Sequence, residues 1–279
     1  MPELPEVETV RRGAAPHLIG RRLRAVHLQR PDLRWPMPAA ALQDLVGRRC
    51  VAVERRSKYV LACFDGPRAP VAMVHLGMTG RLIVDVTARR AARPDYRKHE
   101  HWRMDFADRL VRFVDPRRFG ALDVCDGDEL ATHPLIRGLG IEPLEAGFDA
   151  AFLHRLTRKR KVAIKQLLMN GNLIVGVGNI YASESCWHAR VRPRRAAGSL
   201  TRAECAALAA AVKKVLAAAI DAGGTSFRDY VGVGEDAGYF ARELRVYERA
   251  GSACPRCSGE VKRAVQQGRS TYWCSGCQR

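Results

Sequence analysis

The spacing of apolar residues changes along the chain. After Pro5, the stretch Glu6–Leu18 carries apolar residues at helical spacing and acidic residues in its first turn, which predicts a first helix. From about Leu23 to Val124 the apolar residues fall in short runs separated by turn formers, a pattern typical of a β-sandwich. The expected strands are Val51–Val53, Tyr59–Phe64, Val71–Leu76, Leu82–Val86, Leu110–Val114 and Ala121–Val124.

Beyond Gly138 the pattern becomes helical. Apolar residues recur at spacings of three and four in Phe152–Met169, Ile180–Trp187 and Thr201–Ala222. Glycines follow the last of these helices, and the final segment, Val246–Arg279, is expected to be a small module built around four cysteines.

Length and charge narrow the class of protein. A chain of 279 residues favours two domains and a small appendage over one compact unit. The formal net charge of +18 makes a polyanion the expected partner. No run of 18 apolar residues is present, and the acidic, proline-rich start does not resemble an export signal, so we expect a cytoplasmic protein without a membrane span.

The cysteines fall into two groups. Five of the nine are scattered singly among apolar neighbours, as buried free thiols usually are. The other four form two CxxC pairs separated by sixteen residues: Cys254, Cys257, Cys274 and Cys277. This spacing predicts one structural Zn²⁺ held by four thiolates, with no open position for chemistry. Redox-active CxxC pairs are the alternative, but so short a tail cannot bury a core without the metal.

The predicted zinc site holds a β-hairpin. Its expected strands lie near Glu260–Val265 and Thr271–Trp273, and the connection between them presents Arg269 at a rigid tip. An arginine in a turn is more often solvated than functional, so only the other motifs of the sequence can support a functional role for Arg269.

The N-terminus carries a candidate nucleophile. Methionine before proline is commonly removed, which leaves Pro2 as a secondary amine with a pKa of about 8. Such an amine can attack the anomeric carbon of a deoxyribose, and the adjacent Glu3 can move protons to or from the sugar. The plainer alternative is that these residues only begin a helix, with proline and acids in the first turn.

Several blocks of the sequence resemble one family. The opening MPELPEVETVRRG is similar to the N-terminal signature of formamidopyrimidine-DNA glycosylases, and further blocks follow in family order: RRSKYVL at 55–61, HLGMTG at 75–80, DPRRFG at 115–120, GVGNIYASE at 176–184 and the terminal four-cysteine finger. The resemblance covers essentially the whole chain.

The resemblance implies an α+β multidomain fold. It consists of an N-terminal β-sandwich domain with a leading helix (1–135), a helical helix-two-turns-helix domain (136–244) and a C-terminal zinc-finger β-hairpin (245–279). It also implies that the loop 227–239 covers the extruded lesion base.

The resemblance assigns catalytic roles to four residues. Pro2 matches the Schiff-base nucleophile and Glu3 the general acid. Lys58 matches the lysine that donates a proton during β-elimination, and Arg269 matches the finger arginine linked to δ-elimination.

Further residues match DNA contacts of the family. Extruding a nucleotide leaves a gap that must be filled, and Met78, Arg117 and Phe119 match the filling trio. Without the surrounding motifs, Met78 and Phe119 would be predicted to be ordinary core residues. Asn179 matches a phosphate-binding residue, and His75, His99 and Lys161 match further DNA contacts.

The expected function is a base-excision-repair DNA glycosylase with abasic-site lyase activity. The resemblance implies that it acts on 8-oxoguanine and formamidopyrimidines, and that its partner is double-stranded DNA with oxidised purines or abasic sites. We expect a cytoplasmic monomer associated with the nucleoid. No catalytic metal or organic cofactor is expected. One alternative is an endonuclease VIII-like enzyme for oxidised pyrimidines, but Leu4 within PELPE favours the purine-directed branch of the family. The other alternative is a non-catalytic binder of damaged DNA.

Overall fold

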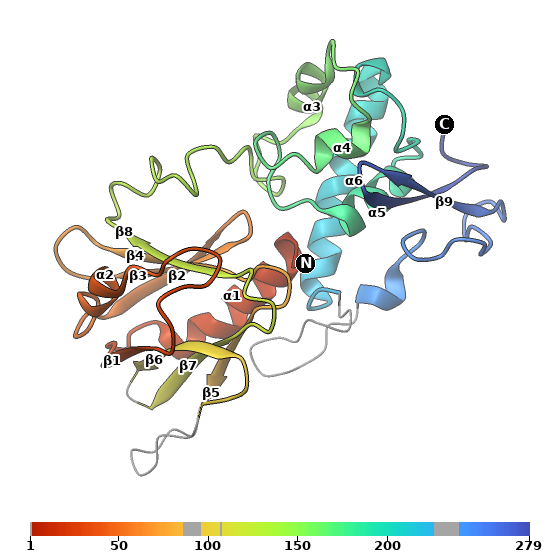
Figure 1. Ribbon diagram of the computed structural model, residues 1–279. Coiled ribbons are helices and arrows are strands. Elements are labelled where there is room, and N and C mark those ends of the chain that lie inside the picture. Colours follow the sequence, from red (N-terminus) through yellow and green to blue (C-terminus); the bar gives the residue numbers. More distant parts are fainter. Residues whose placement is uncertain (1, 86–95, 107, 226–239) are drawn as a thin grey trace. The chain divides into compact units, whose positions relative to one another are not determined.

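The computed structural model describes residues 2–85, 96–106, 108–225 and 240–279 (Figure 1). It divides into two compact units. The first consists of Met1–Gly138 with a segment that begins at Gly223, and the second of Leu139–Ala222 and Phe240–Arg279. The bounds of the three domains expected above stay a prediction. The loop expected to cover the lesion lies outside the described residues.

Two antiparallel four-stranded sheets build the first unit (Figure 1). One sheet has the order β1-β6-β7-β5 and the other β2-β3-β4-β8. The strands are β1 (Ala25–Leu28), β2 (Cys50–Arg56), β3 (Tyr59–Phe64), β4 (Val71–His75), β5 (Arg81–Asp85), β6 (Glu100–Phe106), β7 (Arg109–Val114) and β8 (Ala121–Cys125). A short helix, α2 (Ala39–Gln43), precedes β2. The expected β-sandwich is confirmed, with β1 and β6 in addition to the six expected strands.

The first helix, α1 (Leu4–Leu18), packs into the core that the two sheets share. Val7, Val10 and Ala14 lie on its buried face, as their helical spacing predicts. Glu3 is the N-cap, and a capping box joins it to Glu6, whose carboxylate accepts a hydrogen bond from the Glu3 N–H at 2.8 Å. The start of the chain is therefore held by its own first turn.

The second unit contains four helices among the described residues: α3 (Ala150–Thr157), α4 (Ile164–Leu168), α5 (Asn179–His188) and α6 (Arg202–Asp221). Short 3-10 turns lie at Ala197–Ser199 and Phe240–Glu243. The helical spacing predicted over Phe152–Met169 corresponds to two helices, α3 and α4, because the chain leaves the first helix at Arg158 and Lys159 has a left-handed φ of 58°. A run of four cations, 158–161, occupies the break.

The C-terminal module is the expected hairpin, formed by β9 (Val261–Gln266) and β10 (Arg269–Cys274). Gln267 and Gly268 form its two-residue turn, with φ of 49° and 73°. Trp187 of α5 and Val246 pack with Val261, Tyr272 and two of the cysteines in a small core.

The single cysteines behave as expected of inert thiols. Four are buried, whereas Cys63 is half-buried. Burial is the main cause that raises the pKa of Cys50 and Cys186 to about 12, so these thiols stay protonated. Within the described part of the chain, no helix has the length and apolar character needed to cross a bilayer.

Candidate functional site

Three sequence motifs meet at one end of the β-sandwich. The strand register pairs Tyr59 with His75, and His75 with Ala121. In the other sheet, Arg81 pairs with Val114. Consequently the turn between β2 and β3, the turn 76–80 and the loop 115–120 all emerge at the same end.

The turn that carries Lys58 is fixed to α1. Arg55 of β2 donates to the Glu8 carboxylate at 3.2 Å and to the carbonyl of Ser57 at 3.0 Å. Burial raises the pKa of Glu8, but hydrogen bonds and charges from its arginine partners outweigh this and lower it, so Glu8 stays ionised. Lys58, which is half-buried, therefore lies beside the N-terminal half of α1.

Pro2 and Glu3 lie at the start of the same helix and are both buried. The Glu6 carboxylate connects this start of the helix to Thr225, because it also accepts hydrogen bonds from the N–H and hydroxyl of Thr225 at 2.9 and 2.8 Å. The structure thus places Pro2, Glu3 and Lys58 around the N-terminal half of α1. Removal of Met1 would turn the Pro2 nitrogen into a free amine. Such an amine, with a carboxyl group and an ammonium group in the same region, can combine nucleophilic attack with proton transfer.

The turn 76–80 and the loop 115–120 present large apolar side chains to solvent. Met78 is 36% exposed and Phe119 is 42% exposed. The guanidinium of Arg117 lies 4.8 Å from the centre of the Phe119 ring. Neither apolar residue is part of the core, contrary to what its type suggests in isolation. An exposed methionine, ring and guanidinium on two neighbouring turns form a surface suited to insertion into a stacked structure.

The two histidines among the predicted contacts differ in environment. His75 is half-buried and packs against Tyr59, with ring centres 4.9 Å apart. Burial, helped by the charges of Lys58 and Arg34, lowers the pKa of His75 to about 4. The neutral ring accepts a hydrogen bond from Gly77 N–H at 3.0 Å, so it shapes the turn 76–80. His99 is exposed and has a left-handed φ of 65°.

In the second unit, Asn179 is the first residue of α5. Its side-chain oxygen accepts a hydrogen bond from the ammonium of Lys165 at 2.6 Å, and its amide lies 3.4 Å from the Tyr247 hydroxyl. The N-terminus of a ten-residue helix attracts anions, and the half-buried Asn179 is oriented there. Lys161 is exposed in the break before α4.

The same lysine connects Asn179 to the hairpin. Lys165 is fully buried, and its ammonium also donates to the Ser270 carbonyl at 3.0 Å and to the Thr271 hydroxyl at 2.8 Å. Arg269, next to Ser270, is exposed at the first position of β10 beside the turn. Asn179 and Arg269 therefore lie on one side of the second unit.

The four clustered cysteines have the geometry of a tetrahedral metal site. Their sulfurs all lie within 4.8 Å of one another, with the pairs Cys254–Cys277 at 3.9 Å and Cys257–Cys274 at 3.4 Å. Zinc–sulfur bonds of about 2.3 Å place tetrahedral ligands roughly 3.8 Å apart. The residues present therefore fit a zinc ion.

Hydrogen bonds to the sulfurs support the same interpretation. The indole N–H of Trp187 donates to the Cys254 sulfur at 3.3 Å, and backbone N–H groups of Arg256 and Gly276 donate to Cys254 and Cys274. Burial raises the pKa of Cys254, but these and neighbouring donors lower it to about 6. Burial and the adjacent thiols raise the pKa of Cys277 to about 12. A cation at the centre would let all four ionise.

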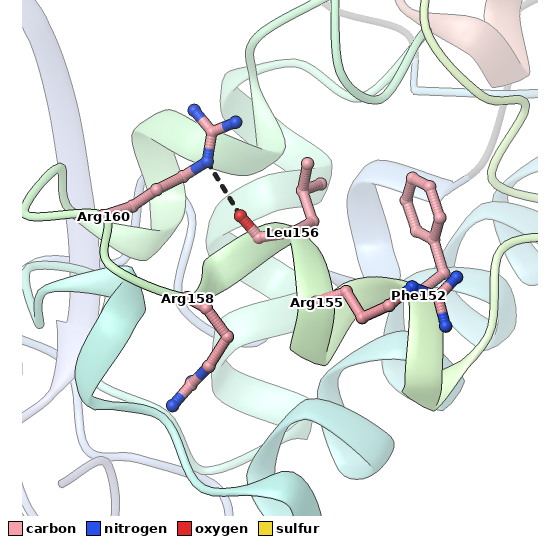
Figure 2. Close-up of a pocket in the computed structure, with 5 residues that line it drawn as sticks. All are labelled: Phe152, Arg155, Leu156, Arg158 and Arg160. Carbon is pink, nitrogen blue, oxygen red and sulfur yellow. Dashed lines mark hydrogen bonds between the residues drawn. The ribbon is translucent and has the colours of Figure 1, made fainter.

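A separate pocket of about 360 Å³ lies on α3 and the segment after it (Figure 2). Its lining is Phe152, Arg155, Leu156, Arg158 and Arg160. The Arg158 and Arg160 side chains are tied to the carbonyls of Leu200 and Leu156 at 2.5 and 2.8 Å. No carboxylate, thiol or imidazole lines it, so it offers positive charge but no group for proton transfer.

Sequence reasoning missed residues that hold the site together. Lys165 was predicted only to lie in a segment with helical spacing, although it is the buried link described above. Glu184, inside the GVGNIYASE block, accepts three backbone hydrogen bonds from residues 245–247 at 2.9 to 3.0 Å. Burial raises its pKa despite those bonds. Asp115 opens the DPRRFG block and is fully buried. The motif strings contained these residues, but nothing in them indicated burial.

Comparisons with known proteins match this arrangement. Residues 1–122 match the model of the formamidopyrimidine-DNA glycosylase N-terminal domain, and residues 139–231 match that of the formamidopyrimidine-DNA glycosylase H2TH domain. A protein of Thioalkalivibrio sulfidiphilus named formamidopyrimidine-DNA glycosylase is 49% identical, and one of Thiobacillus denitrificans with the same name is 48% identical. Each alignment covers 100% of both chains.

Solved structures agree in fold. A crystal structure of a Lactococcus lactis FPG mutant in complex with Fapy-dG-containing DNA has a TM-score of 0.89 at 30% identity and covers 100% of both chains. The L. lactis Fpg complex with abasic-site DNA gives 0.88 at 30% identity over 99% of both chains. MutM (Fpg) of Thermus thermophilus gives 0.86 at 37% identity over 99% of this chain and 98% of that chain.

Proposed function

The chain belongs to the formamidopyrimidine-DNA glycosylase family, and from that premise we propose that Pro2, Glu3, Lys58 and Arg269 carry out its reaction. The protein is a base-excision-repair glycosylase for oxidised purines, with abasic-site lyase activity. Its partner is DNA that contains such lesions or abasic sites. The observation that carries the residue assignment is the placement of Pro2, Glu3 and Lys58 around one end of α1.

Removal of Met1 would make Pro2 a secondary amine that is partly neutral at pH 7 to 8. Its nitrogen bonds to C1′ of the extruded nucleotide as the bond from C1′ to the base breaks. Glu3 supplies a proton to the ring oxygen O4′, the sugar opens, and the nitrogen–carbon bond becomes an iminium. When C2′ loses a proton, the iminium accepts the electron pair of that C–H bond and becomes an enamine. The enamine then uses this pair to expel the 3′ phosphate, which leaves with the electrons of its bond to C3′.

Lys58 and Arg269 complete the strand cleavage. Lys58 donates a proton in β-elimination, and its ammonium pairs with a phosphate beside the attacked sugar. Arg269, exposed at the hairpin turn, promotes loss of the second phosphate. These roles come from the family resemblance, and the positions of both side chains support them.

The gap left in the duplex is filled by Met78, Arg117 and Phe119. Exposure of the apolar pair and the contact of Arg117 with the Phe119 ring support this assignment. The Arg117 guanidinium would hydrogen-bond the base that has lost its partner.

Phosphate binding falls to residues of both units. Asn179 presents its amide at the N-terminus of α5, and Lys161 and His99 offer exposed side chains. His75 contributes by shaping the turn 76–80. We also propose that the enzyme acts in the cytoplasm, at the nucleoid, because its substrate is genomic DNA.

Zn²⁺ would occupy the cluster of Cys254, Cys257, Cys274 and Cys277 and hold the hairpin. A four-sulfur site supplies no open coordination position, so the ion's contribution is structural. Bound there, the ion would hold β9 and β10 next to the turn that presents Arg269.

Borohydride trapping tests the reaction. Protein whose intact mass shows loss of Met1 is mixed with a duplex that contains 8-oxoguanine, and borohydride should freeze the iminium as a covalent adduct. A matched control with an extra Gly-Ser before Pro2 keeps every residue of the enzyme but has no free imino group, and should give no adduct. Salt-sensitive binding without any adduct would identify a non-catalytic binder instead.

Oxidised pyrimidines are a second substrate class to compare. One structural neighbour is the wild-type L. lactis Fpg in a complex with DNA that contains an oxidised pyrimidine. We expect excision of 8-oxoguanine to exceed that of thymine glycol in matched duplexes. The reverse order would assign this chain the pyrimidine specificity.

A further inference from the structure

Asp115 lies at the junction of the two turns that carry the proposed gap-filling residues. It follows the last residue of β7 and is fully buried. One carboxylate oxygen accepts a hydrogen bond from the Thr79 hydroxyl at 2.5 Å, and the other accepts one from Gly120 N–H at 2.8 Å. A buried carboxylate is costly unless its oxygens are hydrogen-bonded, and these bonds satisfy both oxygens.

The groups that Asp115 binds are direct neighbours of the filling residues. Thr79 follows Met78, and Gly120 follows Phe119. The backbone N–H of Arg117 lies 3.3 Å from both the Asp115 carboxylate and the Thr79 hydroxyl. One carboxylate therefore sets the backbone beside all three side chains.

The peptide groups of Asp115 extend this network to a third segment. Its N–H donates to the carbonyl of His99 at 3.0 Å, and its own carbonyl accepts a hydrogen bond from the His101 ring at 2.7 Å. The turn before β6, which presents His99, is thereby tied to the loop 115–120.

The two turns also touch through their backbones. Gly77 has a φ of 65°, and a Cβ atom there would meet the Gly120 nitrogen at 2.5 Å. Met78 and Phe119 are themselves exposed, so their positions depend on the backbone beneath them. Buried, charge-assisted hydrogen bonds are stronger than neutral ones, and Asp115 supplies them at this point.

We propose that Asp115 is a positioning residue that locks the turn 76–80 and the loop 115–120 into one rigid wedge, so that Met78, Arg117 and Phe119 enter duplex DNA together. This inference rests on the proposed function. It predicts that loss of the Asp115 hydrogen bonds impairs base extrusion and filling of the gap in duplex DNA. The lyase reaction on single-stranded DNA, which needs neither step, should be unaffected.

Two substrates separate these steps. Excision of 8-oxoguanine opposite cytosine in a duplex needs extrusion and gap filling, whereas β-elimination at an abasic site in a single-stranded oligonucleotide needs neither. Asp115→Asn and Thr79→Val each remove part of the lock with little change in volume. Misplacement by about 1 Å can cost on the order of 100-fold in rate. We expect the single-turnover duplex rate to fall about 10- to 100-fold and the single-strand rate to change less than about two-fold.

Thr79→Ser is the matched control, because it keeps the hydroxyl and should therefore retain most of the wild-type rate on the duplex. Discrimination between cytosine and adenine opposite the lesion should also weaken in Asp115→Asn and Thr79→Val. If Asp115→Asn does not fold, the pair Thr79→Val and Thr79→Ser still tests the lock.

Equal losses on both substrates, or no loss on the duplex in soluble folded variants, would overturn the role of Asp115. Wild-type protein that gives no borohydride adduct would instead contradict the proposed function. Each failure therefore has its own signature.

Discussion

At the scale of single residues, the buried Lys165 connects two parts of the proposed site, which the sequence motifs did not indicate. Lys165 uses its three N–H donors on Asn179, Ser270 and Thr271, at 2.6 to 3.0 Å. A lysine is rarely buried without such partners. Its ammonium connects the proposed phosphate contact on α5 to the hairpin that presents Arg269, so a mutation here should affect both.

Replacement of Lys165 by methionine tests this link. Methionine keeps an unbranched chain but leaves three acceptors without their donor. We expect the free energy of unfolding to fall by about 2 kcal/mol and the Kd for an abasic-site duplex to rise about ten-fold. Thermal melting and fluorescence anisotropy measure the two effects. Lys214→Met, at an exposed position of α6, is the control, and an equal effect of both variants would contradict the link.

Residue types could be predicted from the sequence better than residue environments. The motif blocks pointed to Pro2, Lys58 and Asn179 by type and order, and the register and hydrogen bonds supplied their neighbours. Burial of Asp115 and Lys165 could not be predicted, because a charged residue is buried only where distant parts of the chain supply its partners.

At the scale of elements, the local pattern of apolar residues failed to predict the structure where charged residues are buried or where a residue has a left-handed φ. The strand β6 was not expected, because its sequence EHWRMDF does not alternate cleanly. Three of its polar residues, Glu100, His101 and Arg103, are buried nonetheless. Glu100 pairs with Arg112 of β7 at 2.6 Å, and Arg112 also pairs with Asp85 at 2.5 Å. Ion pairs across three strands thus permit polar residues at core positions.

The hairpin turn offers a test at this scale. Gly268 has a φ of 73°, which a residue with a Cβ atom adopts at a cost of about 1 kcal/mol. Gly268→Ala should destabilise the turn next to Arg269, slow δ-elimination more than β-elimination, and leave borohydride trapping intact. Product analysis on gels separates the two eliminations. Gly171→Ala, where a Cβ meets nothing within 4 Å, is the control, and the idea fails if both variants give wild-type product ratios.

At the scale of the whole molecule, net charge predicted a polyanionic partner without locating its site. Of the excess cations behind the +18 charge, some serve structure: Arg195 pairs with Glu204 at 2.5 Å and is the main cause that lowers the pKa of Glu204 to about 2. Composition cannot distinguish such a cation from one that faces DNA. Only those that neutralise phosphates release counterions on binding.

Salt dependence makes that distinction measurable. For a duplex, the logarithm of affinity falls with the logarithm of salt concentration by about 0.9 per phosphate contact. Lys161→Ala should therefore reduce this slope by about 1 and weaken binding to damaged and undamaged duplexes alike. Arg68→Ala is the matched control, because Arg68 lies in the turn between β3 and β4 and pairs with Asp126 at 3.2 Å. If both variants shift the slope equally, the positive charge acts as a diffuse field and Lys161 makes no specific phosphate contact.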